Sequence, residues 1–186
     1  MAKEFKPTKE QLQAAAGTTI PDVLAPGMRL ILCGINPSLY SAAVEHHFAR
    51  PGNRFWPALH RAGITPRLYS PFEDASLAEL GLGLTNMVAR ATARADELSS
   101  EELIEGKAIL ENKLRKYKPK HIAFLGVTAY RSAFEEPKAQ MGLQEEKWAN
   151  VSVWILPNPS GLNAHYQLDD FAELFRELWR QTEAKD

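Results

Sequence analysis

Short apolar runs alternate with amphipathic segments along most of the chain. Runs of mainly apolar residues bounded by turn residues predict buried strands at 28–34, 83–88, 121–126 and 151–156. Capping residues and three-to-four-residue apolar spacing predict helices at 8–16, 53–62, 74–80, 99–117, 128–134 and 168–179. The segment directly after the first strand is expected to be a loop, and residues 135–150 a polar excursion.

This alternation of strands and helices favours an α/β fold. It predicts a central, mainly parallel sheet of four strands with helices on both faces. A chain of 186 residues suits one domain. We expect that domain to span residues 28–186, preceded by a polar N-terminal lead-in at residues 1–27.

Charge excludes a uniformly basic nucleic-acid binder, because the net charge of the whole chain is −1. Its distribution is uneven. Residues 46–95 contain six arginines and three acidic residues, for a net charge of +3, whereas residues 96–186 have a net charge of −4. The planar guanidinium fork of arginine suits phosphate groups, although ordinary surface charge explains the same count.

Metal and redox chemistry find no support in the sequence. The single cysteine, Cys33, excludes an internal disulfide and a cysteine-ligated cluster, and the five histidines lack metal-ligand spacing. We therefore expect no metal or cofactor. The N-terminus lacks a signal peptide, and no run reaches the roughly 18 apolar residues of a membrane span, which favours a cytoplasmic protein.

Two Asn-Pro pairs indicate where chemistry could occur. Asn36-Pro37 follows the first predicted strand and Asn158-Pro159 follows the last. Proline keeps the preceding residue extended, and ligands of open α/β sheets bind at the carboxyl ends of the strands. A single pair is typical of a turn, but two pairs at equivalent strand ends favour a site there.

Four segments then carry a resemblance to a known family. They are 34–38 (GINPS), 48–56 (FARPGNRFW), 84–88 (LTNMV) and 156–162 (LPNPSGL). In this order they resemble the mismatch-specific uracil-DNA glycosylase and thymine-DNA glycosylase family. The resemblance implies a uracil-DNA-glycosylase-like three-layer α/β/α sandwich. It also implies a monomeric enzyme that hydrolyses the bond between a base and deoxyribose, without a cofactor, in double-stranded DNA with a mismatched or damaged base.

The resemblance also implies roles for individual residues. Asn36 would position the attacking water, and Phe48 would stack on a base flipped out of the helix. Backbone N–H groups near Ile35, Ser38 and Phe48 would stabilise the departing base anion. The remaining substrate contacts would come from Ser41, which lies near C5 of the base, and from Asn86 and Asn158.

Asp96 is a second catalytic candidate. It lies in the loop after the second predicted strand, at the same rim of the sheet as Asn36. A carboxylate there could activate water or stabilise the positive charge that develops on the sugar. The alternative is an ordinary acidic residue that precedes the helix at 99–117.

DNA contacts are expected on both sides of the site. Leu162 matches the family's intercalating wedge, with Ser160, Gly161 and Asn163 around it. Phosphate contacts are expected from Arg50 and Arg54, with Arg90, Arg94, Lys138 and Lys147 as further candidates. The family often has an arginine two residues after the wedge, where this chain has Ala164. Dependence on an opposite guanine should therefore be relaxed, and single-stranded DNA becomes a plausible substrate.

Two other functions fit parts of the pattern. A non-catalytic module that senses flipped or mismatched bases would need Phe48 and Leu162 but no water site. A Rossmann-like small-molecule enzyme could use the Asn-Pro loops, but the chain has no glycine-rich phosphate loop. The single cysteine excludes the iron–sulfur branch of uracil glycosylases.

Overall fold

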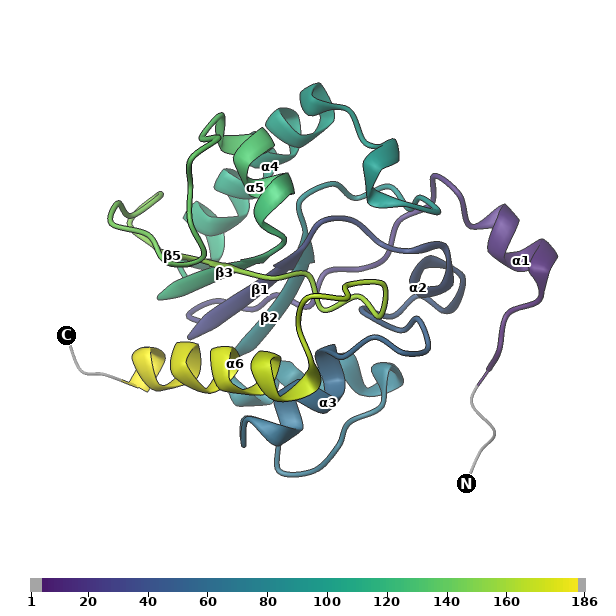
Figure 1. Cartoon of the computed structure of the whole chain (residues 1–186), viewed down its shortest axis with the longest axis horizontal. Coiled ribbons are helices and arrows are strands. Elements are labelled where there is room, and N and C mark those ends of the chain that lie inside the picture. The colour runs from purple at the N-terminus through teal and green to yellow at the C-terminus, as the bar shows by residue number, and fades with distance from the viewer. Residues whose placement is uncertain (1–4, 184–186) are drawn as a thin grey trace.

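The computed structural model of the chain describes residues 5–183 (Figure 1). Its centre is a five-stranded sheet with the order β2-β1-β3-β5-β4. Four strands are parallel to their neighbours: β1 (Leu30–Gly34), β2 (Leu82–Asn86), β3 (His121–Leu125) and β5 (Ser152–Leu156). These are the four strands that the apolar runs predict.

A fifth strand corrects the predicted four-stranded sheet. Strand β4 (Gly142–Leu143) pairs antiparallel with β5 at the sheet edge, inside the segment expected to be a polar excursion. Two residues are too few to show an alternation of apolar and polar positions, so the sequence gives no signal for this strand.

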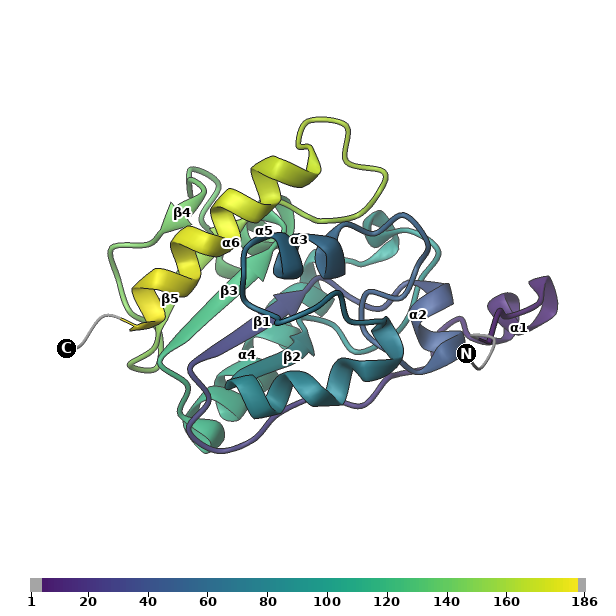
Figure 2. The ribbon, with the colours of Figure 1, turned by 90° about the horizontal axis from the view of Figure 1, so that it is seen from below.

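Helices cover both faces of the sheet. Helices α3 (Phe55–Arg61) and α6 (Leu168–Glu183) pack side by side on one face, as Figure 2 shows. Helices α4 (Ser100–Tyr117) and α5 (Val127–Phe134) pack together on the other face (Figure 1). The molecule is therefore the three-layer α/β/α sandwich expected above. Across residues 5–183, no helix is long and apolar enough to cross a membrane.

Alternate residues of each strand build two separate cores, because successive side chains of a strand point to opposite faces. In β1, Leu30 and Leu32 pack under α3 and α6, whereas Ile31 and Cys33 pack under α4 and α5. The aromatic rings of Phe55, Phe171 and Phe175 fill the first core, and Phe124 and Tyr130 lie in the second. Burial on both faces explains why the strands appear in the sequence as nearly continuous apolar runs.

Local signals determine where the helices begin. Ser99 and Glu102 form the predicted capping box of α4, and Thr8 and Gln11 form one at α1 (Lys9–Ala14). Two other elements differ from the expectation. The loop after β1 contains a short helix, α2 (Leu39–Val44), capped by Ser38. The segment expected as a helix at 74–80 is a 3₁₀ helix, η1 (Pro71–Leu80).

Residues Asp22 and Val23, within the predicted lead-in, lie against the sheet edge; residues 1–4 of the lead-in and 184–186 of the predicted domain lie outside the described residues. Val23 forms an antiparallel bridge with Leu84 of β2, and the carboxylate of Asp22 bonds to the Thr85 hydroxyl and to Lys113 of α4. These contacts cover a strand edge that would otherwise be exposed for pairing.

Candidate active site

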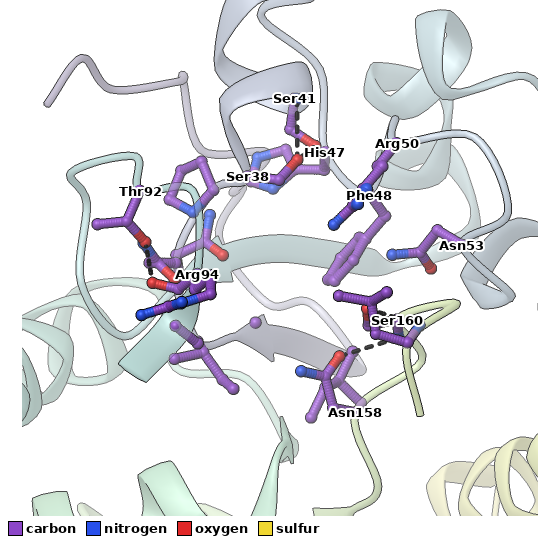
Figure 3. A pocket seen from close by; sticks show the side chains of 18 of the residues that line it. Ser38, Ser41, His47, Phe48, Arg50, Asn53, Thr92, Arg94, Asn158 and Ser160 are labelled. Atoms are coloured by element: carbon purple, nitrogen blue, oxygen red, sulfur yellow. Dashed lines mark hydrogen bonds between the residues drawn. The ribbon is translucent and has the colours of Figure 1, made fainter. Parts of the chain in front are cut away.

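A cavity of about 450 Å³ opens at the carboxyl ends of the parallel strands (Figure 3). The chain passes from β1 to β2 on one side and later returns to β3 on the other, so this is the point where the strand order reverses. Thirteen of the residues predicted from the sequence line the cavity: Ile35, Asn36, Ser38, Ser41, Phe48, Arg50, Asn86, Arg94, Asp96, Asn158, Ser160, Leu162 and Asn163. Arg54 and Gly161 do not line it.

The side-chain amide of Asn36 is held in a fixed orientation. Its Nδ2 donates to the carbonyl oxygen of Arg90 (2.9 Å) and to Thr92 Oγ1 (2.8 Å). Thr92 Oγ1 in turn donates its proton to the Arg94 carbonyl oxygen, so toward Asn36 this oxygen can only accept. Both partners of the Asn36 side chain are therefore acceptors. Its side-chain oxygen, Oδ1, is left to accept a hydrogen bond from a molecule in the cavity.

Phe48 provides an aromatic wall. Its ring stacks on Phe55, with centroids 4.0 Å apart and planes inclined by 18°. Because Phe55 is fully buried and covers one face of the Phe48 ring, the ring's other side is the one that can meet a ligand. Phe48 has a left-handed backbone (φ 52°), an unusual conformation for a bulky residue and one that neighbouring contacts must hold.

Those contacts come mainly from the preceding residue, His47, which is 1% exposed. Its Nε2 lies 2.8 Å from the Pro21 carbonyl oxygen, which can only accept, so Nε2 bears the proton. Its backbone N–H donates to Asp74, and its carbonyl oxygen accepts from the Trp56 indole. The loop that presents Phe48 is thus attached to three separate parts of the fold.

Gly34 forms the floor of the cavity. A Cβ atom at this position would lie 2.6 Å from Asn86 Oδ1 and 3.2 Å from the Phe48 ring. Glycine is therefore required here by close approach of these two side chains. The Asn86 amide makes no hydrogen bond within the described part of the chain, so both its donor and its acceptor groups are available to a ligand.

Hydroxyl groups tie α2 to the Phe48 loop. The Ser38 hydroxyl donates to Ser41 Oγ, which also accepts from the Ala49 backbone N–H. Within residues 5–183, the backbone N–H groups of Ser38 and Phe48 have no hydrogen-bond partner. Two unpaired donors at the wall of one cavity form a site that suits a negatively charged oxygen or nitrogen.

Asp96 lies at the exposed rim of the cavity. It belongs to a short 3₁₀ turn, η2 (Ala95–Glu97), and pairs with Arg94 at 3.0 Å. Both side chains are 72% exposed. The structure thus brings Asp96 to the same cavity as Asn36, but in a solvated setting rather than a buried one.

The loop after β5 carries the candidate wedge. Leu162 is 73% exposed, the most exposed of the large apolar side chains in the described residues. Asn158 Oδ1 accepts from the Ser160 backbone N–H, and the Asn163 amide donates to the Asn158 carbonyl oxygen. At Gly161 a Cβ would approach the Gly52 carbonyl oxygen to 2.8 Å, so glycine is needed where this loop meets the loop after Phe48.

Arg54 holds the loop after β5 through hydrogen bonds to its backbone. Its guanidinium donates to the backbone carbonyl oxygens of Gly161, Asn163 and Tyr166. Its own backbone N–H donates to Pro159. Three of the five N–H donors of the guanidinium are thus used within the protein.

The other candidate phosphate ligands differ in availability. Arg50 is exposed and lines the cavity, and its guanidinium has no ion pair or hydrogen bond in the described structure. Arg90 is paired with Glu102 of α4. Lys138 and Lys147 do not line the cavity. Of the predicted cations, Arg50 is therefore the best placed to bind an anion at the rim, with Arg94 second.

Three polar residues line the cavity without having been predicted as site residues: Thr92, His47 and Asn53. Thr92 follows the second strand by a few residues, as Asp96 does. This position after a strand end is the sequence feature that could have identified Thr92 as a site residue. Asn53 was expected to be the N-cap of the helix that follows, but the N-cap is Arg54. Asn53 lies one residue earlier, where its Oδ1 accepts from the Phe55 backbone N–H, and it also lines the cavity.

Comparison with known proteins identifies the family of the chain. Residues 21–183 match the Uracil DNA glycosylase superfamily, so the chain belongs to that superfamily of DNA glycosylases. A solution NMR structure described as a "putative Uracil DNA glycosylase" from Methanosarcina acetivorans is similar, with a TM-score of 0.59 and 19% identity. The match covers 88% of this chain and 98% of that one, and it supports the same fold.

The buried His47 predicts a pH dependence of stability. Burial lowers the pKa of His47, and the hydrogen bond to Pro21 and the nearby Asp74 carboxylate only partly offset this. The unfolded chain therefore binds this proton more readily than the folded one, so the free energy of unfolding should fall as the pH drops below about 6.5.

Urea denaturation at several pH values between about 7 and about 5 checks this expectation. His47→Gln should be less stable near neutral pH and should show a flatter decline over that range. His165→Gln, a change at an exposed histidine, should keep the wild-type slope. An unchanged slope in His47→Gln would contradict the assignment.

Proposed function

We propose that this chain is a DNA glycosylase that hydrolyses the N-glycosidic bond of uracil in DNA, in mismatched pairs but with relaxed dependence on the opposite base, and so initiates base-excision repair. Thymine and other modified pyrimidines are further candidate substrates. The observation that carries the proposal is the fixed amide of Asn36, whose carbonyl oxygen shares one cavity with the free face of Phe48.

A base must leave the helical stack to be reached in this cavity. The flipped pyrimidine would stack on Phe48 and place its polar edge against the Asn86 amide, which has both a donor and an acceptor to offer. The Asn158 side chain borders the same space. A cavity of about 450 Å³ holds one base with room for a water molecule.

Charge separates as the glycosidic bond breaks, so the site must stabilise the departing base and orient the attacking water. The departing base gains negative charge, and the unpaired backbone N–H groups of Ser38 and Phe48 would stabilise it. The Asn36 carbonyl oxygen would accept a hydrogen bond from the attacking water. An amide is too weakly basic to take the proton, so its role is to orient the water.

Asp96 is the proposed source of negative charge near the sugar. From the rim it would stabilise the positive charge that develops on deoxyribose, or accept the proton of the water. Its exposure and its pairing with Arg94 weaken that interaction by solvent screening. We therefore assign Asp96 a smaller share of catalysis than Asn36.

DNA would bind across the rim of the cavity. Leu162 would fill the gap left by the flipped nucleotide, and Arg50 would contact a backbone phosphate. Arg54 has a different role in this proposal from the phosphate contact expected from the sequence: it positions the loop that carries the wedge.

Single-turnover excision from a uracil-containing duplex, with abasic sites as the readout, tests the two catalytic assignments. Asn36→Ala should lower the rate by about 10²–10³-fold, because the water loses its orienting acceptor. Asp96→Ala should lower it by about tenfold. An unimpaired Asp96→Ala enzyme would end the role of Asp96, and complete absence of product from the wild type would favour the non-catalytic base-sensing module.

The base opposite uracil provides a second test. Ala164 occupies the position where the resembling family often carries an arginine, so this chain has no long side chain there to recognise a guanine. Excision rates for uracil opposite each of the four bases, and in a single strand, should lie within about tenfold of one another. A strong preference for a guanine partner would contradict relaxed specificity. In that case the wild type would already discriminate without an arginine at this position, and Ala164→Arg should have little effect on the preference.

A further inference from the structure

A second cavity of about 750 Å³ lies at the opposite end of the sheet, where β3 and β5 begin. Five-residue strands separate it from the candidate active site by about 15 Å along the strand direction. Its wall combines the end of α4 with the turn at residues 147–151 and one residue of α6, Gln181. None of the residues that line the candidate active site contributes to it; Lys147, a candidate DNA-phosphate ligand in the sequence, lines this second cavity instead.

The lining of this amino-end cavity is strongly cationic. Its charged side chains are Arg115, Lys118, Lys120 and Lys147, and no acidic residue of the described chain lines it. Arg115 pairs with Glu111, but the three lysines have no ion pair within residues 5–183. This cluster of positive charge lies in a part of the chain, residues 96–186, that has a net charge of −4 as a whole.

Neutral hydrogen-bond donors accompany the lysines. Trp154 lines the cavity at 4% exposure, and its indole N–H is buried with no hydrogen-bond partner in the described structure. Unpaired buried donors are uncommon in folded proteins and often mark a place for a water or an ion. The side chains of Asn150 and Ser152 also line the cavity without a hydrogen bond to the described residues.

We propose that this amino-end cavity binds a small polyvalent anion of the phosphate class. Three unpaired ammonium groups supply the charge, and the indole, amide and hydroxyl groups supply further donors directly or through water. The concave shape favours a compact ligand over the convex backbone of a duplex. The proposal is independent of base excision, because it uses none of the residues of the candidate active site.

Titration with inorganic pyrophosphate, followed by ¹H–¹⁵N NMR of the whole protein, tests this proposal. The indole N–H signal of Trp154, assigned by its loss in Trp154→Phe, should shift saturably. In Lys120→Gln/Lys147→Gln the dissociation constant should rise by about tenfold or more, because two exposed charges are lost. Lys116→Gln is the control: this exposed lysine near the end of α4 does not line the cavity, so its loss should change the dissociation constant by less than about twofold.

Three results would overturn the proposal. The first is the absence of a saturable shift up to about 10 mM pyrophosphate, a range in which even weak sites are occupied. The second is equal affinity in the double lysine variant and the wild type, with both proteins folded by circular dichroism. The third is lysine-dependent binding of a uracil-free single-stranded oligonucleotide at this cavity without saturable binding of pyrophosphate, which would identify a nucleic-acid surface.

Discussion

The side-chain amide of Asn36 joins the ends of two strands, and the rest of the candidate site depends on this link. Its Nδ2 bonds to the Arg90 carbonyl oxygen and to the Thr92 hydroxyl, so the loop after β1 is tied to the loop after β2. The same bonds direct the amide oxygen toward the cavity. Asn36 thereby fixes the position of two loops at one wall of the site. It also holds its side-chain oxygen ready to accept from the proposed water before any DNA is bound.

The sheet makes this geometry possible by bringing distant segments to one edge. Gly34 lets Asn86 and Phe48 approach over the end of β1, and the buried Phe55 fixes the Phe48 ring from behind. Arg54 then holds the wedge loop through three backbone carbonyls. Rigid packing thus supports both an aromatic wall and an exposed leucine. In the proposed function, a few rim residues recognise the DNA, which is consistent with a near-neutral chain.

Sequence predicts most of the framework, because burial of strands on both faces and capping boxes such as Ser99 with Glu102 are local signals. It does not predict α2 or β4, which are too short for periodicity to appear. The loops of the site can be predicted from the sequence because they follow strand ends, as Asn36 and Asn158 show. The role of Arg54 cannot be predicted in this way, because its three carbonyl partners lie more than a hundred residues away and are set by tertiary structure alone.

The most direct test of this account removes the Thr92 hydroxyl. Thr92→Val keeps the shape of a buried side chain but can neither accept from Asn36 nor donate to Arg94. Single-turnover excision of uracil should fall by about 10–100-fold with little change in DNA affinity, and Thr92→Ser should restore it to within about threefold of wild type. A Thr92→Val enzyme as fast as the wild type would contradict the claim that the orientation of Asn36 controls the chemistry.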